Sequence, residues 1–142
     1  MSTLQRLGAT ALTAALLTVP VLGTTVTADA APARAGKSWT TIATWEGARQ
    51  QACKVSIRDG AAWKIYGRLV NGRQAKIGAG MNVRRGDDVT STWSSPLVAK
   101  GKTSDVGAVI LPRRPGFVFE AFQFSAQAGT GAEVAVQKIG RC

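Results

Sequence analysis

The chain contains two cysteines, whose positions decide whether their thiols are reactive or form a disulfide. Cys53 lies in "QQACKVSIRDG", and Cys142 ends the sequence in "AVQKIGRC". No histidine and no cationic helix start flanks either thiol, so little favours a reactive thiolate or an intermolecular bridge. Two lone cysteines in an exported chain ordinarily pair with each other. We therefore predict a Cys53–Cys142 disulfide that clasps the first strand of the domain to the last.

The side chains that catalysis usually needs are sparse. The sequence contains no histidine, which removes the commonest general base and the commonest metal ligand. Four of its acidic residues stand in turn or loop sequences: Asp59, Asp87, Asp88 and Asp105. The pattern indicates no carboxylate pair, no calcium loop and no nucleophile with a base, and a serine–lysine pair has no motif behind it. We expect a protein that is not an enzyme and that has no metal or cofactor.

Basic residues dominate the charge. The formal net charge is +10, and residues 31–142 keep this value because Arg6 and Asp29 cancel. Such a cation attracts polyanions. We expect a basic face on the outer side of the first three strands, formed by Lys54, Arg58, Lys64, Tyr66, Arg68 and Lys76. It could hold an anionic or saccharide ligand, although outer sheet faces are ordinarily polar and lysines protect sheet edges. One aromatic residue does not favour specific nucleic-acid binding.

A second basic element is the loop "LPRRPG", in which Arg113 and Arg114 stand between two prolines. A stiff loop of this kind could present arginine to a trypsin-like protease, although Pro115 would resist cleavage after Arg114. The tripeptide Arg85-Gly86-Asp87 matches the one that integrins recognise, but turn chemistry alone explains "RRGDD" between two strands.

Two tryptophans precede the first cysteine. Trp39, Ile42 and Trp45 recur at threefold spacing with threonines between them. One interpretation is an extended arm that docks on a partner by adding a strand, anchored by the tryptophans. The alternative is an opening strand or strap whose tryptophans plug one end of the core.

The first thirty residues are typical of a secretory signal peptide. Arg6 precedes an uncharged run from Leu7 to Leu22, and Ala28-Asp29-Ala30 places small residues at a cleavage site. The run is too short and too rich in Thr and Gly to favour a membrane span. We expect a secreted, extracellular bacterial protein with residues 1–30 removed, an N-terminal arm or strap at 31–48 and a β-domain at 49–142.

The elements that must position these residues are strands. Period-two alternation recurs between turn signals, and no stretch after residue 30 shows apolar residues at helical spacing. "CKVSIR" places Cys53, Val55 and Ile57 inward, and "WKIYGRL" places Trp63, Ile65 and Leu69 inward. Matching these faces requires loops of three or five residues at Asp59-Gly60 and Asn71-Gly72. The same register pairs Arg68 with Lys76 and places Tyr66 between Lys54 and Gly78.

Later segments continue the pattern. "VTSTW" predicts a short strand and "VGAVIL" a buried one, joined by the polar connection "SSPLVAKGKTSD". In "FVFEAFQF", a bulge at Glu120-Ala121 would bring all four phenylalanines to one face. The final strand is expected at "EVAVQKI", with Val134, Val136 and Cys142 inward. About seven strands without a helix predict a small antiparallel β-sandwich, with a small barrel as the alternative.

The sequence leaves three functions open. The first is a non-catalytic protein-interaction module, such as an adaptor in a secreted assembly or toxin particle, whose partner is another secreted protein. The second is a basic protein that binds an anionic wall polymer or other polyanion, with an antibacterial role. The third is a protease inhibitor that uses the loop with Arg113 and Arg114.

Overall fold

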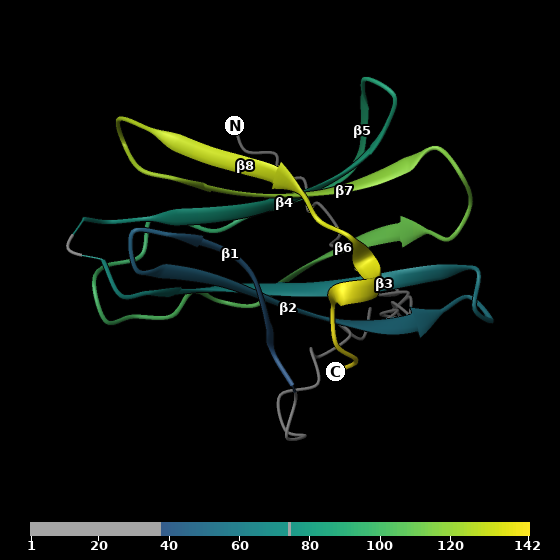
Figure 1. Cartoon of the computed structure of the whole chain (residues 1–142), viewed down its shortest axis with the longest axis horizontal. Helices are drawn as coiled ribbons and strands as arrows, with labels where there is room; N and C mark the ends of the chain where they lie inside the picture. Colours follow the sequence, from purple (N-terminus) through teal and green to yellow (C-terminus); the bar gives the residue numbers. More distant parts are fainter. Residues whose placement is uncertain (1–37, 74) are drawn as a thin grey trace, which may run out of the picture. The chain divides into compact units, whose positions relative to one another are not determined.

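A computed structural model describes residues 38–73 and 75–142. The expected signal peptide at 1–30 and the first part of the arm, 31–37, lie outside the described residues. The expectation of an all-β sandwich is confirmed, because the described part consists of two antiparallel sheets (Figure 1). One short 3-10 helix, η1, follows the last strand. The elements are β1 (Thr40–Trp45), β2 (Ala48–Ile57), β3 (Ala62–Asn71), β4 (Gly78–Arg85), β5 (Asp88–Ser94), β6 (Gly107–Pro112), β7 (Phe117–Phe124), β8 (Gly129–Glu133) and η1 (Val136–Lys138).

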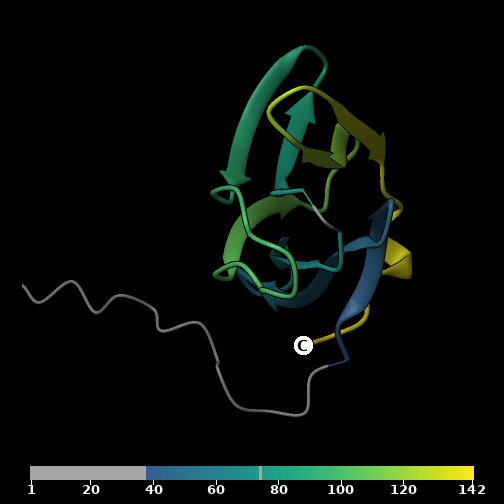
Figure 2. The same ribbon diagram turned by 90° about the vertical axis from the view of Figure 1, so that its left-hand side faces the viewer.

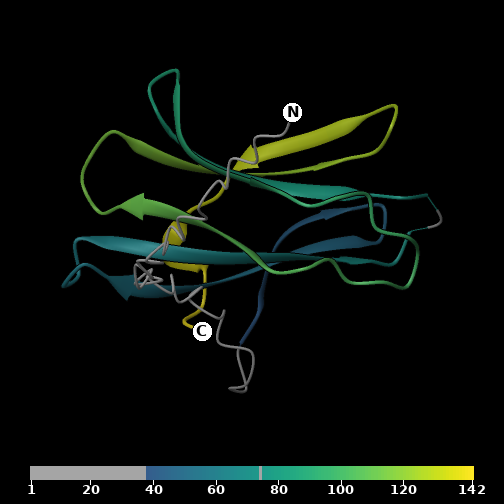
Figure 3. The same cartoon turned by 180° about the vertical axis from the view of Figure 1, so that it is seen from behind.

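Each sheet has four strands. The first has the order β1-β2-β3-β6, and the second has the order β5-β4-β7-β8. The chain crosses between the sheets after β3, after β5 and after β6. Figure 3 shows that the β6–β7 turn lies at the same end of the sandwich as the β2–β3 turn, and Figure 1 agrees. Residues from these two turns can therefore meet.

The β2–β3 turn has an even number of residues, which corrects the predicted register. Ile57 is opposite Ala62, so the turn contains the four residues 58–61. Arg58, Asp59 and Gly60 have positive φ angles of 52°, 50° and 89°. A four-residue turn pairs odd-numbered residues of one strand with even-numbered residues of the other. The inner face of β2 is therefore the face that the prediction placed outside. It carries the even-numbered residues Ala48, Gln50, Ala52 and Lys54, while Cys53 lies on the outer face opposite Tyr66.

The connection at Asn71-Gly72 is not a hairpin turn. It leads from β3 in the first sheet to β4 in the second, so β3 pairs with β2 and β6 instead of β4. The expected pair of Arg68 with Lys76 is therefore wrong, because Arg68 is opposite Gln51. Tyr66 lies between Cys53 and Ala108, and it is not next to Gly78.

The expected bulge in β7 is also absent. β7 pairs with β4 in unbroken register from Phe117 to Phe124. Phe119 is 2% exposed in the core, whereas Phe122 and Phe124 lie on the outer face. There they rest on glycines of β4, because a Cβ at Gly80 or Gly78 would overlap the ring of Phe122 or Phe124. Glycine thus supports two outer rings that the prediction placed in the core.

The core fills the space between the two sheets. Its main cluster joins Ile65, Val109 and Leu111 of the first sheet to Met81, Val83 and Phe119 of the second. A smaller cluster around Leu69 and Ile77 includes the half-buried Trp45. The last strand was predicted too late in the sequence. β8 is Gly129–Glu133, and its five residues are all exposed, whereas Val134 and Val136 pack on the main cluster from the segment that follows.

Candidate functional site

The C-terminal segment closes one edge of the first sheet. Figure 2 shows it beside β1. It pairs with β2 at Lys54, just beyond Ala52, where the pairing of β1 with β2 ends. The amide of Lys54 donates to Gly140 at 3.0 Å, and the amide of Cys142 donates to the Lys54 carbonyl at 3.1 Å. The predicted disulfide is confirmed: Cys53 bonds to Cys142 with their Cα atoms 5.0 Å apart. The expectation that both cysteines face the core is wrong for Cys53, which the register of β2 places on the outer face.

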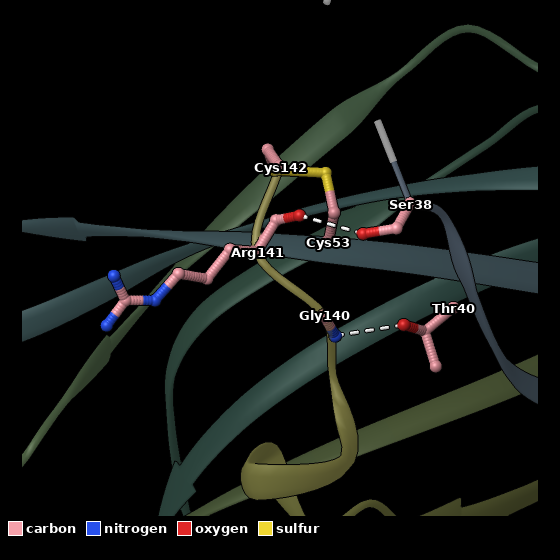
Figure 4. The surroundings of a disulfide bond; sticks show 6 residues. All are labelled: Ser38, Thr40, Cys53, Gly140, Arg141 and Cys142. Atoms are coloured by element: carbon pink, nitrogen blue, oxygen red, sulfur yellow. Dashed lines mark hydrogen bonds between the residues drawn. A yellow bond between two sulfur atoms is a disulfide. The ribbon is translucent and has the colours of Figure 1, made fainter. Parts of the chain in front are cut away.

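Two side-chain contacts fix the same segment to β1 and to Ser38, which lies two residues before β1. In Figure 4, the Thr40 hydroxyl accepts a hydrogen bond from the Gly140 amide at 2.9 Å, and the Ser38 hydroxyl donates to the Arg141 carbonyl at 3.1 Å. The clasp therefore holds both the opening strand and the strand that carries Cys53.

The register of β2 places Lys54 in the gap between the sheets. Lys54 lies opposite Ile65, a core residue, and is only 7% exposed. Its ammonium donates a hydrogen bond to the carbonyl of Val136 and lies 4.9 Å from the centre of the Trp63 ring. A lysine predicted on the solvent face is thus an interior cation.

A cleft of about 690 Å³ opens beside this lysine. Its walls come from β2, β3, the end of β6, the β6–β7 turn, the start of β7 and residues 133–137. We call it the cationic cleft and define it by Lys54, Trp63, Arg113, Arg114, Phe117 and Val136. Its volume is in the range of sites that hold small ligands.

Four cations contact the aromatic rings of the cleft: Lys54 and Arg113 at Trp63, and Arg114 and Arg85 at Phe117. The guanidinium of Arg113 lies 3.5 Å from the centre of the Trp63 ring, so Arg113 and Lys54 share one indole. Arg113 also donates to the Ser56 hydroxyl at 2.9 Å. Arg114 lies 5.0 Å from the centre of the Phe117 ring. These contacts hold positive charge in place by cation–π attraction.

The lining of the cleft carries more cations than carboxylates. The ion pairs between described residues use Glu46, Asp87 and Glu120 with Arg73 or Arg84, and none includes Lys54, Arg113 or Arg114. Glu133 is the acidic residue that lines the cleft. Burial lowers the pKa of Lys54, and the nearby charges of Arg141 and Arg113 lower it further. The ammonium is therefore desolvated and repelled by its neighbours, and an anion would relieve both effects.

The tryptophans of the expected arm contact the domain itself. Thr40–Trp45 forms β1, which is the alternative of an opening strand, and the expected boundary between residues 48 and 49 falls inside β2. Ile42 packs on the main core cluster and Trp45 on the smaller one. The ring of Trp39 lies 4.4 Å from the guanidinium of Arg68.

The structure brings together only part of the expected basic face. Lys64, Tyr66 and Arg68 lie on the outer face of β3 as predicted, with the Lys64 ammonium 5.3 Å from the centre of the Tyr66 ring. Tyr66 is 8% exposed, so it offers little ring surface. Lys54 faces the opposite side of the sheet. Arg58 is in the β2–β3 turn, and Lys76 lies in the connection from β3 to β4.

The basic loop, in contrast, joins Lys54. Arg113 and Arg114 were predicted as an element separate from the basic face, and Trp63, Val134 and Val136 as ordinary inward-facing residues. Their meeting depends on the β2 register and on the C-terminal segment. The available signal was the Asp59-Gly60 dipeptide, because Asp and Gly both tolerate the positive φ angles of an even-numbered turn.

Comparison with protein-family models, with curated proteins and with solved structures finds no match to this chain. Within residues 38–73 and 75–142, no helix has the length and apolar character needed to span a membrane. The same residues contain no group of three or more His, Cys, Asp or Glu side chains placed to hold a metal ion.

Proposed function

We propose that this protein is a secreted, non-catalytic binding protein that holds an anionic ligand in the cationic cleft. The observation that carries the proposal is the pair of cations on Trp63. Lys54 and Arg113 both contact this ring, and neither makes an ion pair with a described carboxylate. Buried charges are ordinarily paired, so a desolvated ammonium without a counter-charge indicates a place for one.

The electrostatics support an anion over a neutral or cationic ligand. The attraction of a bound anion would offset both the solvation that Lys54 loses by burial and the repulsion from Arg113. Charge-assisted hydrogen bonds to carboxylate or phosphate are stronger than neutral ones. The net charge of +10 would also speed the approach of an anion.

Secretion is part of the proposal. The disulfide supports it, because such bonds persist in oxidising compartments. The N-terminal sequence supports it as well, since residues 1–30 have the charge, apolar run and cleavage site of a signal peptide.

The two other candidate functions have less support from the geometry. An adaptor that docks through Trp39 and Trp45 would need rings that the described structure uses within the domain. An inhibitor that presents Arg113 would need a free side chain, and Arg113 is stacked on Trp63 and bonded to Ser56. Anion binding, in contrast, requires no rearrangement of Lys54 or Arg113.

The test is calorimetric titration of the oxidised protein with three anionic probes: inorganic phosphate, octyl phosphate and polyphosphate. We expect at least one probe to bind at low salt and to weaken as salt rises. Lys54→Met and Arg113→Gln should each weaken that binding at least tenfold. Glu133→Gln should strengthen it, because it removes the carboxylate that lines the cleft.

Matched controls separate the cleft from general charge. Lys100→Met and Arg49→Gln each remove one positive charge at an exposed position. Lys64→Met removes one from the outer face of β3. All three should leave the affinity within about twofold of the wild-type value, as expected for screened surface charges. Equal losses in the cleft variants and the controls would contradict the proposed site.

A further inference from the structure

The walls of the cationic cleft have two chemically different parts. One part is cationic and consists of Lys54, Arg113 and Arg114. The other is apolar and includes Leu111, Phe119, Val134 and Val136. The cleft therefore offers both an anion site and a surface for hydrocarbon.

The apolar part is continuous with the core. Leu111 is 6% exposed and Phe119 is 2% exposed, and both belong to the main core cluster. Val134 and Val136 pack against that cluster from the C-terminal segment. The exposed arginines Arg113 and Arg114 stand at the turn, on the solvent side. A ligand that entered would thus contact apolar side chains and charge at the same time.

The size and lining of the cleft favour a small ligand over a polymer strand. A volume of about 690 Å³ accommodates a molecule of drug or metabolite size. Polymer-binding proteins instead follow the backbone charge with a groove or patch of cations. Here the outer face of β3 contributes Lys64 and Arg68, but Lys54 faces the other side of the sheet. The cations of the cleft do not continue as a track across that face.

We propose that the ligand of the cationic cleft is a small amphiphilic anion, a carboxylate or phosphate monoester joined to an apolar chain. The head group binds among Lys54, Arg113 and Arg114. The chain lies along Phe117, Val134 and Val136, the partly exposed apolar side chains of the cleft. This inference rests on the proposed function, since it names the chemical class of ligand for the same site.

The experiment is a chain-length series of dissolved alkyl phosphates, from methyl to octyl, kept below the concentration at which they form micelles. Each buried methylene should raise the affinity about fourfold until the chain leaves the cleft. Inorganic phosphate measures the head group alone, and octanol measures the chain alone. We expect octyl phosphate to bind one molecule per protein and more tightly than either.

Variants assign the two parts of the ligand to the two parts of the cleft. Lys54→Met and Arg113→Gln should lower the affinity of every alkyl phosphate by a similar factor and keep the dependence on chain length. Val134→Asn should reduce that dependence and leave inorganic phosphate unaffected. Val89→Asn is the control for Val134→Asn, because Val89 is 52% exposed and belongs to β5, outside the cleft. Arg113 is exposed, so Arg113→Gln remains informative if Lys54→Met fails to fold.

The outcomes separate this inference from the proposed function. If inorganic phosphate binds as tightly as octyl phosphate, and both depend on Arg113, the amphiphile is wrong and the anion site stands. Preference for polyphosphate, or binding only to vesicles that contain phosphatidic acid, would also overturn the dissolved amphiphile. If octanol binds like octyl phosphate and Arg113→Gln changes neither, both proposals fail.

Discussion

The amide of Cys142 donates a hydrogen bond to the carbonyl of Lys54 at 3.1 Å. The residue that closes the disulfide therefore also holds the backbone of the lysine in the cationic cleft. The Lys54 side chain is bonded to the same C-terminal segment, through the carbonyl of Val136. Clasp and cleft are one connected structure, and changes to the clasp should affect both stability and binding.

Removing the clasp should destabilise the domain. The disulfide joins residues 89 positions apart, so the Cys53→Ser, Cys142→Ser double variant should lose ~2 to 4 kcal/mol of unfolding free energy. Urea unfolding measures this, and wild-type protein in a reducing agent is the matched control. The double variant should also bind anions more weakly, since the segment that carries Val136 is released. A midpoint unchanged by reduction would show that hydrogen bonds alone hold the segment.

The charge of Lys54 should make stability depend on alkaline pH. Its pKa is lowered in the folded protein by burial and by Arg141 and Arg113, from 10.5 in the unfolded chain. Between these two pKa values the unfolded chain binds more protons, so stability should rise with pH in that interval. Urea unfolding of wild type and Lys54→Met across alkaline pH isolates the effect. The wild type should gain stability relative to the variant as pH rises, and parallel curves would contradict an interior ammonium.

Gln123 is a buried polar residue that should reduce stability. It is 1% exposed on the inner face of β7, and neither its amide nitrogen nor its amide oxygen has a hydrogen-bond partner in the described residues. Leaving such a group unpaired costs about 1 to 3 kcal/mol. Gln123→Met, which keeps the side-chain length, should therefore raise the unfolding free energy. Gln50→Met is the comparison, because the Gln50 amide nitrogen donates to the Gly80 carbonyl at 2.8 Å and only its amide oxygen is unpaired among the described residues, so this change removes a hydrogen bond that Gln123 lacks. Equal effects of the two changes would contradict this difference.

The stability of the domain should require glycine at position 107, where β6 packs against Trp93 of β5. A Cβ at this position would overlap the indole of Trp93, which reaches across from β5. Gly107→Ala should cost about 1 to 3 kcal/mol by overpacking, measured by thermal or urea unfolding. Combining it with Trp93→Leu should cost less than the sum of the two single changes. Additive losses would show that the ring does not occupy that space.

The alternation of apolar and polar residues predicts most of the strands. It does not always predict which face of a strand points toward the core. The inner face of β3 was predicted correctly, because Trp63, Ile65 and Leu69 alternate with polar residues. The predicted inner face of β2 is wrong because Val55 and Ile57 are among its most apolar residues, yet the four-residue turn at 58–61 accompanies a register that places the even-numbered residues inward.

The other differences also have local causes. β8 has no alternation to detect, since its five residues are small or polar and all exposed. Phe122 and Phe124 were placed in the core because aromatic residues are usually buried, yet Gly80 and Gly78 let them lie on the outer face. The site depends on these details, because Lys54 enters the cleft only through the four-residue turn.

The most direct test of the central claim is to observe the tryptophan indole signals by NMR while octyl phosphate is added. The chain has 4 tryptophans, and the signal of Trp63 can be assigned as the one missing from a Trp63→Phe variant. Binding in the cationic cleft predicts that the Trp63 signal shifts with saturation while those of Trp39 and Trp45 stay in place. A shift of the Trp39 signal instead, with Trp63 unchanged, would place the anion on the outer face beside Arg68 and contradict the account.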